Sequence, residues 1–508
     1  KAGKATAIMS AYNEINGVYA NENSHLLQEI LVDEWGFDGC VISDWGGSND
    51  HALGVQNGSH LEMPGTGKSG MRDIVKAVQA GTLKEEVLDQ RLDELLSLIF
   101  ATHGTTEKAK GTTFDVEAHH KLARKAAEES IVLLKNQDNI LPLKPGTKVA
   151  VIGDFAKKPR YQGAGSSLVN PAKEPEAILD MIGEYDIVMV SYEQGYVRNR
   201  PPKMDLLRKA KEAAKSADVV LFFGGLDEIS ESEGLDRAHM HMPVAQDELI
   251  NELTTVNKNV IVVLSAGSSV EMPWYPYVKG IVHGYLGGQA GASAMLNVLT
   301  GKVCPSGKLN ETYPLHYEDT PAYEYYPSKE RSSEYREGLY VGYRYYTTVG
   351  KKVRFPFGFG LSYTTFTYRD LAVDQDGVTF KIKNTGDVTG TEIAQLYVGK
   401  ESDSVFRPLR ELKGFARVEL APGEEKEVKI LFDDKTFRFY DTRTDSWEVE
   451  TGTYQIMIGS NAEEMLLEGS LAVNGTVTEG GYSREELPEY ITGEINNISG
   501  DRVRRLHG

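Results

Sequence analysis

The sequence has few of the features that mark several large classes of protein. Only two of its 508 residues are cysteine, Cys40 and Cys304, so neither a disulfide framework nor a thiolate metal site can be built from them alone. No run approaches the ~18 apolar residues that span a membrane. The net charge of −19 makes nucleic acid and anionic membrane surfaces unfavourable partners. A neutral ligand is unaffected by that charge.

The sequence begins abruptly. The chain begins with Lys1, and no positively charged segment followed by an apolar one precedes the first strand. We therefore expect the natural chain to begin further upstream. Low cysteine content suits a reducing compartment, and the expected location is cytoplasmic. Internal repeats and low-complexity tracts are also absent from the sequence.

The length predicts about three domains at roughly 150 residues each. Residues 1–103 alternate strand and helix patterns, including an apolar run at 5–12 that predicts a buried strand. This alternation indicates a parallel sheet, read as the last third of a larger α/β unit. A polar linker follows at 104–117. Residues 118–316 then predict a doubly wound parallel sheet of five apolar strands, after a helix at 118–135.

The composition changes near residue 316. Tyrosine, proline and charged residues dominate 317–345, which we expect to be a linker that lies on other domains. Short alternating strands separated by turn residues predict an antiparallel β-sandwich over 346–475. The polar tail at 476–508 is expected to be poorly ordered.

The stretch "GFDGCVISDWGG" (36–47) ends an apolar strand on a carboxylate and an indole. Functional groups of parallel α/β folds lie at the carboxyl ends of strands, which is where Asp44 is expected. Met9, Tyr12 and the run "LEMPG" (61–65) are predicted at other strand ends. Simpler interpretations remain open: Asp44 can cap a helix, and Met9 and Tyr12 can pack at the rim.

A second loop, "GGLDEISESEGLDRAHMHMP" (224–243), follows an apolar strand and is rich in acids. So many carboxyl groups should raise one another's pKa where water is excluded, and a protonated carboxyl group can act as a general acid. A solvated acidic loop and a divalent cation site are the alternatives. The acids do not alternate around a glycine as calcium ligands do.

The glycine-rich stretch "RYQGAGSS" (160–167) follows another predicted strand. It lacks both the G-x-G-x-x-G spacing and a P-loop lysine, so its serine hydroxyls suit a polar, uncharged ligand better than a nucleotide. Adjacent histidines at 119–120 do not share a helix face, and no H-E-x-x-H occurs. We therefore expect neither a metal nor a cofactor.

Together these stretches resemble the family 3 glycoside hydrolases, in particular their β-glucosidases. The resemblance covers nearly the whole chain and keeps the family's order of motifs. The motifs are "MSAYNEING" (9–17), "GFDGCVISDW" (36–45), "LEMPG" (61–65), "GAGSS" (163–167), "ESEGLDR" (231–237), "VGYRYYTT" (341–348), "FPFGFGLSYTTF" (355–366) and "RPLRELKGF" (407–415).

This resemblance implies an architecture and a set of roles. The family has a (β/α)8-type barrel, an α/β sandwich and a fibronectin type III-like domain, so residues 1–103 would be the C-terminal part of the barrel. Asp44 would be the nucleophile and Glu233 the acid/base of a retaining exo-β-glucosidase. The implied substrate contacts are Met9, Tyr12, Trp45, Ser166 and Ser167.

The chemistry of a retaining glycosidase agrees with these roles. It needs two carboxyl groups roughly 5–5.5 Å apart, one ionised to attack the anomeric carbon and one protonated to release the leaving group. An indole such as Trp45 suits stacking on the apolar face of a sugar. The expected substrates are small oligosaccharides and aryl or alkyl β-glucosides. The formation of a homo-oligomer is left open.

The chain departs from the family at its beginning. Family barrels have further strands before "MSAYNEING", with an aspartate, an arginine and a Lys-His pair that hold the sugar, and we expect little activity from this chain alone. A β-xylosidase or another family 3 glycosidase is one alternative, although the motif "SDW" favours glucose. A β-N-acetylhexosaminidase does not supply its acid from an "ESEG" loop. A non-catalytic carbohydrate-binding or scaffold protein is the alternative from another class.

Overall fold

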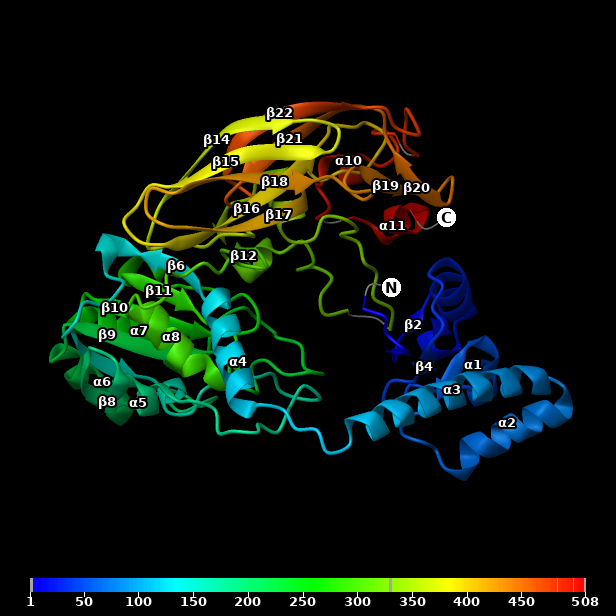
Figure 1. Cartoon of the computed structure of the whole chain (residues 1–508), viewed down its shortest axis with the longest axis horizontal. Coiled ribbons are helices and arrows are strands. Elements are labelled where there is room, and N and C mark those ends of the chain that lie inside the picture. Colours follow the sequence, from blue (N-terminus) through cyan, green and yellow to red (C-terminus); the bar gives the residue numbers. More distant parts are fainter. Residues whose placement is uncertain (1–2, 329–330, 482, 497, 507–508) are drawn as a thin grey trace. The chain divides into compact units, whose positions relative to one another are not determined.

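The computed structural model describes residues 3–328, 331–481, 483–496 and 498–506. The chain divides into two compact units, 1–114 and 115–508 (Figure 1). Parts of three predicted segments lie outside the described residues: 1–2 of the first α/β segment, 329–330 of the second linker, and 482, 497 and 507–508 of the tail. Within the described part, no helix is both long and apolar enough to cross a membrane.

The first unit is built on a three-stranded parallel sheet in the order β1-β4-β5. These strands are β1 (Ala7–Met9), β4 (Cys40–Ile42) and β5 (Ser59–Leu61). A short hairpin of β2 (Glu14–Ile15) and β3 (Val18–Tyr19) follows β1. The helices are η1 (Ala20–Glu22), η2 (His25–Glu34), α1 (His51–Asn57), α2 (Lys68–Ala80) and α3 (Glu85–Ala109).

The core of this unit is small. Leu27 and Leu31 of η2 pack against Val41 of β4. The expectation of a buried strand at 5–12 is wrong, because all three residues of β1 are exposed. β1 is an edge strand that pairs only with β4, so the apolar character of its sequence does not lead to burial.

The second unit begins with a six-stranded sheet in the order β6-β11-β10-β9-β7-β8. The strands are β6 (Val132–Asn136), β7 (Lys148–Ile152), β8 (Val188–Glu193), β9 (Val219–Gly225), β10 (Val260–Ser265) and β11 (Gly280–His283). The helices are α4 (Val116–Ser130), α5 (Ile178–Met181), α6 (Met204–Lys215), α7 (Val244–Val256) and α8 (Gly291–Leu299). Short turns of helix complete it: η3 (Gln137–Asn139), η4 (Asp154–Ala156), η5 (Ile182–Glu184), η6 (Tyr275–Tyr277), η7 (Gly288–Ala290) and η8 (Tyr317–Asp319).

Helices cover both faces of this sheet. Along β9, Val220 and Phe222 join the cluster that contains α6 and α7, whereas Leu221 and Phe223 join the cluster that contains α5 and α8. Successive side chains of a strand point to opposite faces, so a strand covered on both sides is apolar throughout. This explains the continuous apolar runs in the sequence and confirms the doubly wound sheet.

Two boundaries differ from the sequence prediction. The helix predicted at 118–135 ends at Ser130, and the fully buried residues from Val132 onward form β6, which is antiparallel to β11. The polar segment predicted as a linker at 104–117 is largely helical, because α3 continues to Ala109 and α4 begins at Val116. The residues between the two helices are 110–115.

The β-sandwich consists of a three-stranded and a four-stranded antiparallel sheet, in the orders β14-β15-β18 and β17-β16-β21-β22. Their strands are β14 (Phe366–Val373), β15 (Gly377–Asn384), β16 (Gly390–Gly399), β17 (Glu411–Leu420), β18 (Glu425–Leu431), β21 (Gly452–Gly459) and β22 (Met465–Val473). Their inner faces share one apolar core. The predicted combination of α/β and all-β domains is therefore confirmed.

Short elements flank the sandwich. β12 (Tyr313–Pro314) pairs with β13 (Val353–Phe355), and β19 (Arg438–Asp441) pairs with β20 (Ser446–Val449). The remaining helices are α9 (Tyr343–Val349), α10 (Pro488–Thr492) and α11 (Gly500–Leu506). α9 begins inside the segment predicted as a linker at 317–345.

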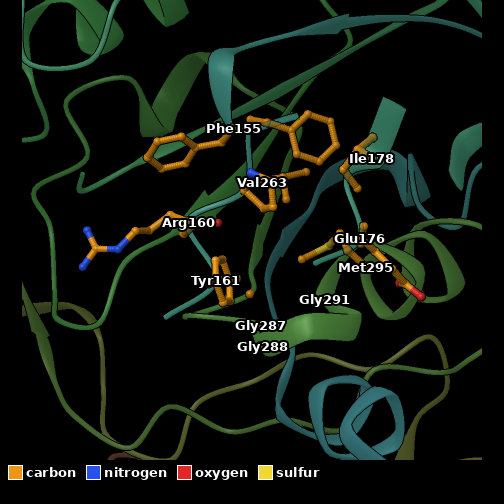
Figure 2. A pocket seen from close by; sticks show the side chains of 15 residues that line it. Phe155, Arg160, Tyr161, Glu176, Ile178, Val263, Gly287, Gly288, Gly291 and Met295 are labelled. Atoms are coloured by element: carbon orange, nitrogen blue, oxygen red, sulfur yellow. The ribbon is translucent and has the colours of Figure 1, made fainter. Parts of the chain in front are cut away.

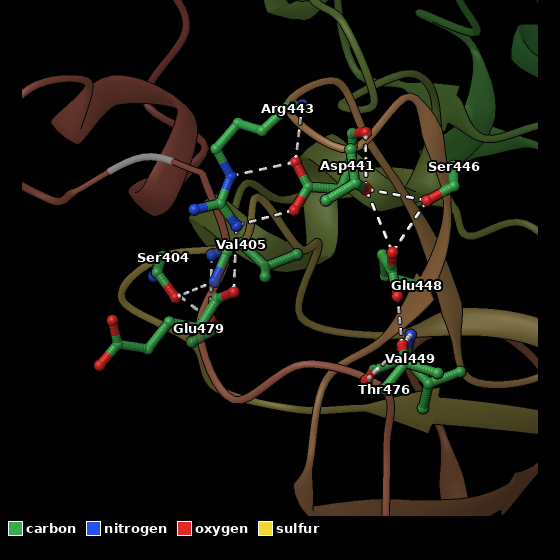
Figure 3. A network of polar contacts seen from close by, with 12 residues as sticks. Ser404, Val405, Asp441, Arg443, Ser446, Glu448, Val449, Thr476 and Glu479 are labelled. Atoms are coloured by element: carbon green, nitrogen blue, oxygen red, sulfur yellow. Dashed lines mark hydrogen bonds and ion pairs between the residues drawn. The ribbon is translucent and has the colours of Figure 1, made fainter.

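The C-terminal tail is held by polar contacts where it leaves the sandwich (Figure 3). The hydroxyl of Thr476 donates to Glu448 and accepts from the backbone amide of Val449 at 2.9 Å. Arg443 is bound to Asp441 at 2.8 Å and donates to the carbonyl of Glu479 at 3.2 Å. The tail therefore starts as an ordered segment tied to the β19–β20 hairpin.

The end of the tail closes a separate apolar cluster. Tyr490 of α10, 3% exposed, packs with Tyr340 and with the buried Ile495 and Val503. Its hydroxyl donates to the carbonyl of Arg336 at 2.7 Å. The expectation of a poorly ordered tail is wrong for these residues, because aromatic side chains of 340–346 supply a partner surface that the polar average of the tail conceals.

We predict that Tyr490→Ala lowers the stability of this region by about 3 kcal/mol or more, because it removes a buried ring and leaves a cavity. The measurement is the thermal unfolding midpoint. Tyr335→Ala, at an 80% exposed position in the adjacent segment, is the control and should leave the midpoint unchanged. Equal midpoints for both variants would contradict the shared cluster.

Candidate active site

The carboxyl ends of β1 and β4 carry four of the predicted site residues. Met9 is the last residue of β1, Tyr12 follows it, and Asp44 and Trp45 follow β4. Trp45 is 65% exposed, Met9 63% and Tyr12 54%, although all three side chains are large and mainly apolar. Apolar side chains left open together at one edge of a sheet are typical of a binding surface.

The turn that contains Asp44 is fixed by its buried neighbour, Ser43. The amide of Ser43 donates to the carbonyl of Leu61 at 2.9 Å, and its hydroxyl accepts from the amide of Met63 at 2.8 Å. The amide of Gly46 also donates to the carbonyl of Met63, at 2.7 Å. The ends of β4 and β5 are thus bound to each other on both sides of Asp44.

The helix-cap interpretation of Asp44 is wrong. The cap of α1 is Asp50, whose carboxylate accepts from the amide of Leu53 at 2.9 Å. The half-buried Asp44 instead accepts from the amide of Trp45 at 2.6 Å. Asp44 is therefore available for a role other than helix capping.

Glu22 supports the same turn and was missed by the sequence analysis. It is only 3% exposed, and its Oε1 accepts from the amides of Asn49 and Asp50 at 2.8 and 3.2 Å. A buried carboxylate normally has partners, and here they are the backbone donors at the start of α1. No local pattern around "ANENS" marks Glu22, because its partners lie 27 and 28 residues further along the chain.

In the second unit, the strand order creates a switch point between β7 and β9. The chain leaves β7 toward the face covered by α5 and leaves β9 toward the face covered by α7. Ligands of doubly wound sheets bind outside the carboxyl ends of strands at such a point. The glycine-rich stretch at 160–167 follows β7, and the acidic loop at 226–243 follows β9.

The acids of that loop have separate partners. Asp227 accepts from the amide of Ser230 at 2.8 Å, and Glu228 binds Arg198 at 2.9 Å. Glu231 accepts from the amide of Gly267 at 2.8 Å and from the hydroxyl of Ser268 at 2.7 Å. Asp236 accepts from the hydroxyl of Tyr326 at 2.5 Å. Among the residues described, no group of three or more metal-ligating side chains is placed to hold an ion.

The side-chain carboxylate of Glu233 contacts the glycine-rich stretch. The hydroxyl of Ser166 donates to Glu233 Oε2 at 2.5 Å, and the Ser166 amide donates to the same oxygen. These bonds stabilise the charged carboxylate and lower the pKa of Glu233. The raised pKa expected where water is excluded does not apply to Glu233, because its side chain is exposed and the two donors of Ser166 lower its pKa. Ser167 is exposed at the next position.

Arg160 holds the two loops together and was not singled out from the sequence. It is 3% exposed, and its guanidinium donates to the carbonyls of Gln162 at 2.9 Å, Glu231 at 3.0 Å and Leu226 at 3.3 Å. Its five donors suit a set of carbonyl oxygens that converge from different segments. The acidic loop is therefore anchored at both ends of the turn that precedes Glu233.

A hollow lined in part by Arg160 and Tyr161 is too small for a sugar. Figure 2 shows Phe155, Tyr161, Val263 and Met295 among its lining residues, and its volume is about 50 Å³. Small-molecule sites are typically ~300–1,000 Å³. Its acid, Glu176, is already bound to His120 at 2.8 Å and to the amide of Ser293 at 3.0 Å.

A larger hollow of about 600 Å³ lies beside the acidic loop. Pro201 and Pro202 line it together with Ile229, Arg237 and His241. Its size suits a small ligand. Glu233 is not among its lining residues, so this hollow is distinct from the contact between Glu233 and Ser166.

The structure thus brings the seven predicted site residues to two places. Met9, Tyr12, Asp44 and Trp45 lie at one sheet edge of the first unit, and Ser166, Ser167 and Glu233 lie on loops of the second. Their individual roles remain predictions.

Three family models match the chain. They are the glycosyl hydrolase family 3 N terminal domain at residues 2–98, the glycosyl hydrolase family 3 C-terminal domain at 131–363 and a fibronectin type III-like domain at 392–462. They coincide with the three-stranded unit, the doubly wound sheet and the sandwich, respectively.

Characterised relatives match 94% of the chain. Thermostable beta-glucosidase B of Acetivibrio thermocellus is 45% identical over 492 residues. An exo-α-(1→6)-L-arabinopyranosidase of Bifidobacterium breve is 41% identical over 491 residues. The chain spans 64% of the length of each of these two proteins.

Solved structures agree with this assignment. The crystal structure of a GH3 beta-glucosidase from Bifidobacterium adolescentis superimposes with a TM-score of 0.87 at 38% identity. The match covers 96% of this chain and 73% of that one. With matching domain order and this level of identity over most of both chains, the protein belongs to glycosyl hydrolase family 3.

Proposed function

We propose that the protein is a retaining, exo-acting β-glucosidase that hydrolyses terminal non-reducing β-D-glucosyl residues of small oligosaccharides and of aryl or alkyl β-glucosides. The observation that carries this proposal is the pairing of a carboxylate with an open indole, Asp44 and Trp45, at the carboxyl end of β4. The 45% identity to a β-glucosidase supports it independently.

Asp44 is the nucleophile in this proposal. Its carboxylate attacks the anomeric carbon while the bond to the leaving oxygen breaks, which gives a glycosyl ester on Asp44. The indole of Trp45 stacks on the sugar ring, and Met9 and Tyr12 line the same subsite. Hydrogen bonds of Ser43 with Leu61 of β5 and with Met63 hold the turn that carries the carboxylate. Accurate placement matters, because misplacement by about 1 Å costs roughly 100-fold in rate.

Glu233 is the acid/base in the same scheme. It protonates the leaving oxygen in the first step and removes a proton from the attacking water in the second, when the ester on Asp44 is released. Ser166 and Ser167 contact the sugar hydroxyls from the second unit. Two carboxyl groups suffice for this chemistry, so the proposal includes neither metal nor cofactor. A cytoplasmic location is part of the proposal.

Several sugars are candidates for the unit that is hydrolysed. An arabinopyranosidase is 41% identical to this chain over a similar length, so an L-arabinopyranosyl unit is the second candidate. A xylosyl unit and a purely binding role are further alternatives. Turnover of matched aryl β-D-glucosides, α-L-arabinopyranosides and β-D-xylosides by a protein extended upstream of residue 1 separates the substrates. Binding by that extended protein without turnover of any of them would indicate the non-catalytic role.

We predict that the 508-residue chain shows little or no turnover of an aryl β-glucoside by itself. Its first unit has a three-stranded parallel sheet, whereas the family resemblance implies further barrel strands with an aspartate, an arginine and a Lys-His pair that hold the sugar. The measurement is release of nitrophenol, compared with a protein extended upstream along its natural reading frame. Robust turnover by the unextended chain would contradict the prediction.

We predict that Asp44→Gly in the extended protein lowers kcat at least about 10³-fold while glucoside binding is largely retained, because loss of a nucleophile removes the covalent step. Asp38→Gly, an exposed acid six residues before Asp44, is the matched control and should keep full activity. Turnover is measured with the aryl glucoside and binding by calorimetry.

A mechanism-based label tests the same residue directly. A 2-deoxy-2-fluoroglucosyl donor slows release of the ester, so peptide mass spectrometry should find the sugar on Asp44 in the extended wild-type protein. A label on another carboxylate would remove Asp44 from the nucleophile role while leaving the retaining mechanism in place. Absence of any label, with turnover intact, would contradict the retaining mechanism.

A further inference from the structure

The loop at residues 163–167 is shaped around the side chain of Glu233. The carbonyl of Ala164 accepts from the Glu233 amide at 3.2 Å, and the amide and hydroxyl of Ser166 both donate to Glu233 Oε2. Three bonds therefore join the loop after β7 to one residue of the loop after β9. Both the backbone and the carboxylate of Glu233 take part in them.

Gly165 makes this close approach possible. Its φ of +94° is strained for residues that have a Cβ, and a Cβ built there would lie 2.6 Å from both Cβ and Oε2 of Glu233. Any side chain at position 165 would displace the carboxylate. Glycine at this position therefore allows the close approach of Glu233. Binding of a phosphate, the common role of a glycine-rich loop after a strand, is not needed to explain it.

No charged partner competes with Ser166 for Glu233 among the contacts described. On the loop of Glu233, the acids Glu231 and Asp236 are bound to Ser268 and Tyr326. On the facing loop, Arg160 is buried and directed to backbone carbonyls. The lowered pKa of Glu233 accordingly has the Ser166 hydroxyl and amide as its causes.

We infer that Ser166 is a positioning residue that holds Glu233 as a hydrogen-bond acceptor, in the form suited to a base, and that Glu233 must leave Ser166 to act as an acid. This inference rests on the proposed function. In the first step, a proton moves from Glu233 to the leaving oxygen as the glycosidic bond breaks. In the second, Glu233 takes a proton from water as the water oxygen bonds to the sugar and the Asp44 ester breaks.

The two steps require opposite properties of one carboxyl group. The first is favoured when Glu233 holds a proton, and the second when it is ionised. Two donors on one oxygen stabilise the ionised form more than the protonated form, because a neutral carboxyl oxygen accepts hydrogen bonds more weakly. Making and breaking the Ser166 contact therefore changes the protonation preference of Glu233 between the steps. A sugar hydroxyl that binds Ser166 would release the carboxylate.

The inference can be tested on the 508-residue chain without any turnover. Glutamate labelled with ¹³C at the carboxyl position is titrated by NMR between pH 3 and 7, and Glu233→Gln identifies the signal of Glu233 by its loss. The expected wild-type midpoint lies below those of exposed glutamates. Ser166→Ala keeps the amide donor and loses the hydroxyl, so its midpoint should move upward.

Two further variants separate positioning from simple structural damage. Ser166→Thr keeps both donors and should restore the low midpoint, whereas Ser167→Ala makes the same chemical change one residue away and should leave the Glu233 titration unmoved. Gly165→Ala should raise the midpoint further than Ser166→Ala, because the new Cβ displaces both donors. Circular dichroism across the titration checks that each variant stays folded.

The outcomes separate this inference from the proposed function. A Glu233 midpoint that is ordinary in the wild type, or unchanged in Ser166→Ala, would overturn the inference even if the extended protein hydrolyses glucosides. In the extended protein, Ser166→Ala should also shift the basic limb of the kcat/KM profile to higher pH, since Glu233 then stays protonated up to a higher pH. If the Glu233 midpoint is low and rises in Ser166→Ala, but the extended protein has no glycosidase activity, the contact between Ser166 and Glu233 is supported. Only the catalytic role of Glu233 is then rejected.

Discussion

The arrangement of this protein depends on the need to cover parallel β-strands on both faces. In the doubly wound sheet, Val220 and Leu221 of β9 point into two different apolar clusters, so this central strand has no surface left for chemistry. Only the strand ends are free to vary. Asp44 follows β4, and the loops of Ser166 and Glu233 follow β7 and β9, because these are the positions that the constraint leaves open.

Polar contacts to the backbone then give these open ends a defined shape. Ser43 binds the end of β4 to β5, Glu22 binds the turn that follows, and Arg160 joins the two loops of the second unit. These three residues are buried, and each satisfies backbone groups that would otherwise lack partners. The predicted catalytic acids are thus placed on loops, but on loops fixed by buried polar side chains.

Glu233 illustrates how geometry decides the chemistry of an acidic loop. Counting the acids predicts mutual repulsion and a raised pKa, whereas the opposite direction results when each carboxylate has its own donor and Glu233 receives two from Ser166. The number of acids in the loop alone therefore predicts the wrong direction for the pKa of Glu233. The same holds for the C-terminal segment, whose polar average conceals Tyr490 and its partners.

The sequence by itself determined the domain types, the five parallel strands of the doubly wound sheet and the loops that carry Asp44 and Glu233, because apolar periodicity and motif order are local properties. It could not determine the antiparallel β6, the exposure of β1 or the supporting roles of Glu22 and Arg160. Those depend on partners distant in the chain: β6 is antiparallel because it pairs with β11, and Glu22 is buried because it meets Asn49 and Asp50. Only the tertiary structure brings such residues together, so only it could reveal that Ser166 and Glu233 are in contact.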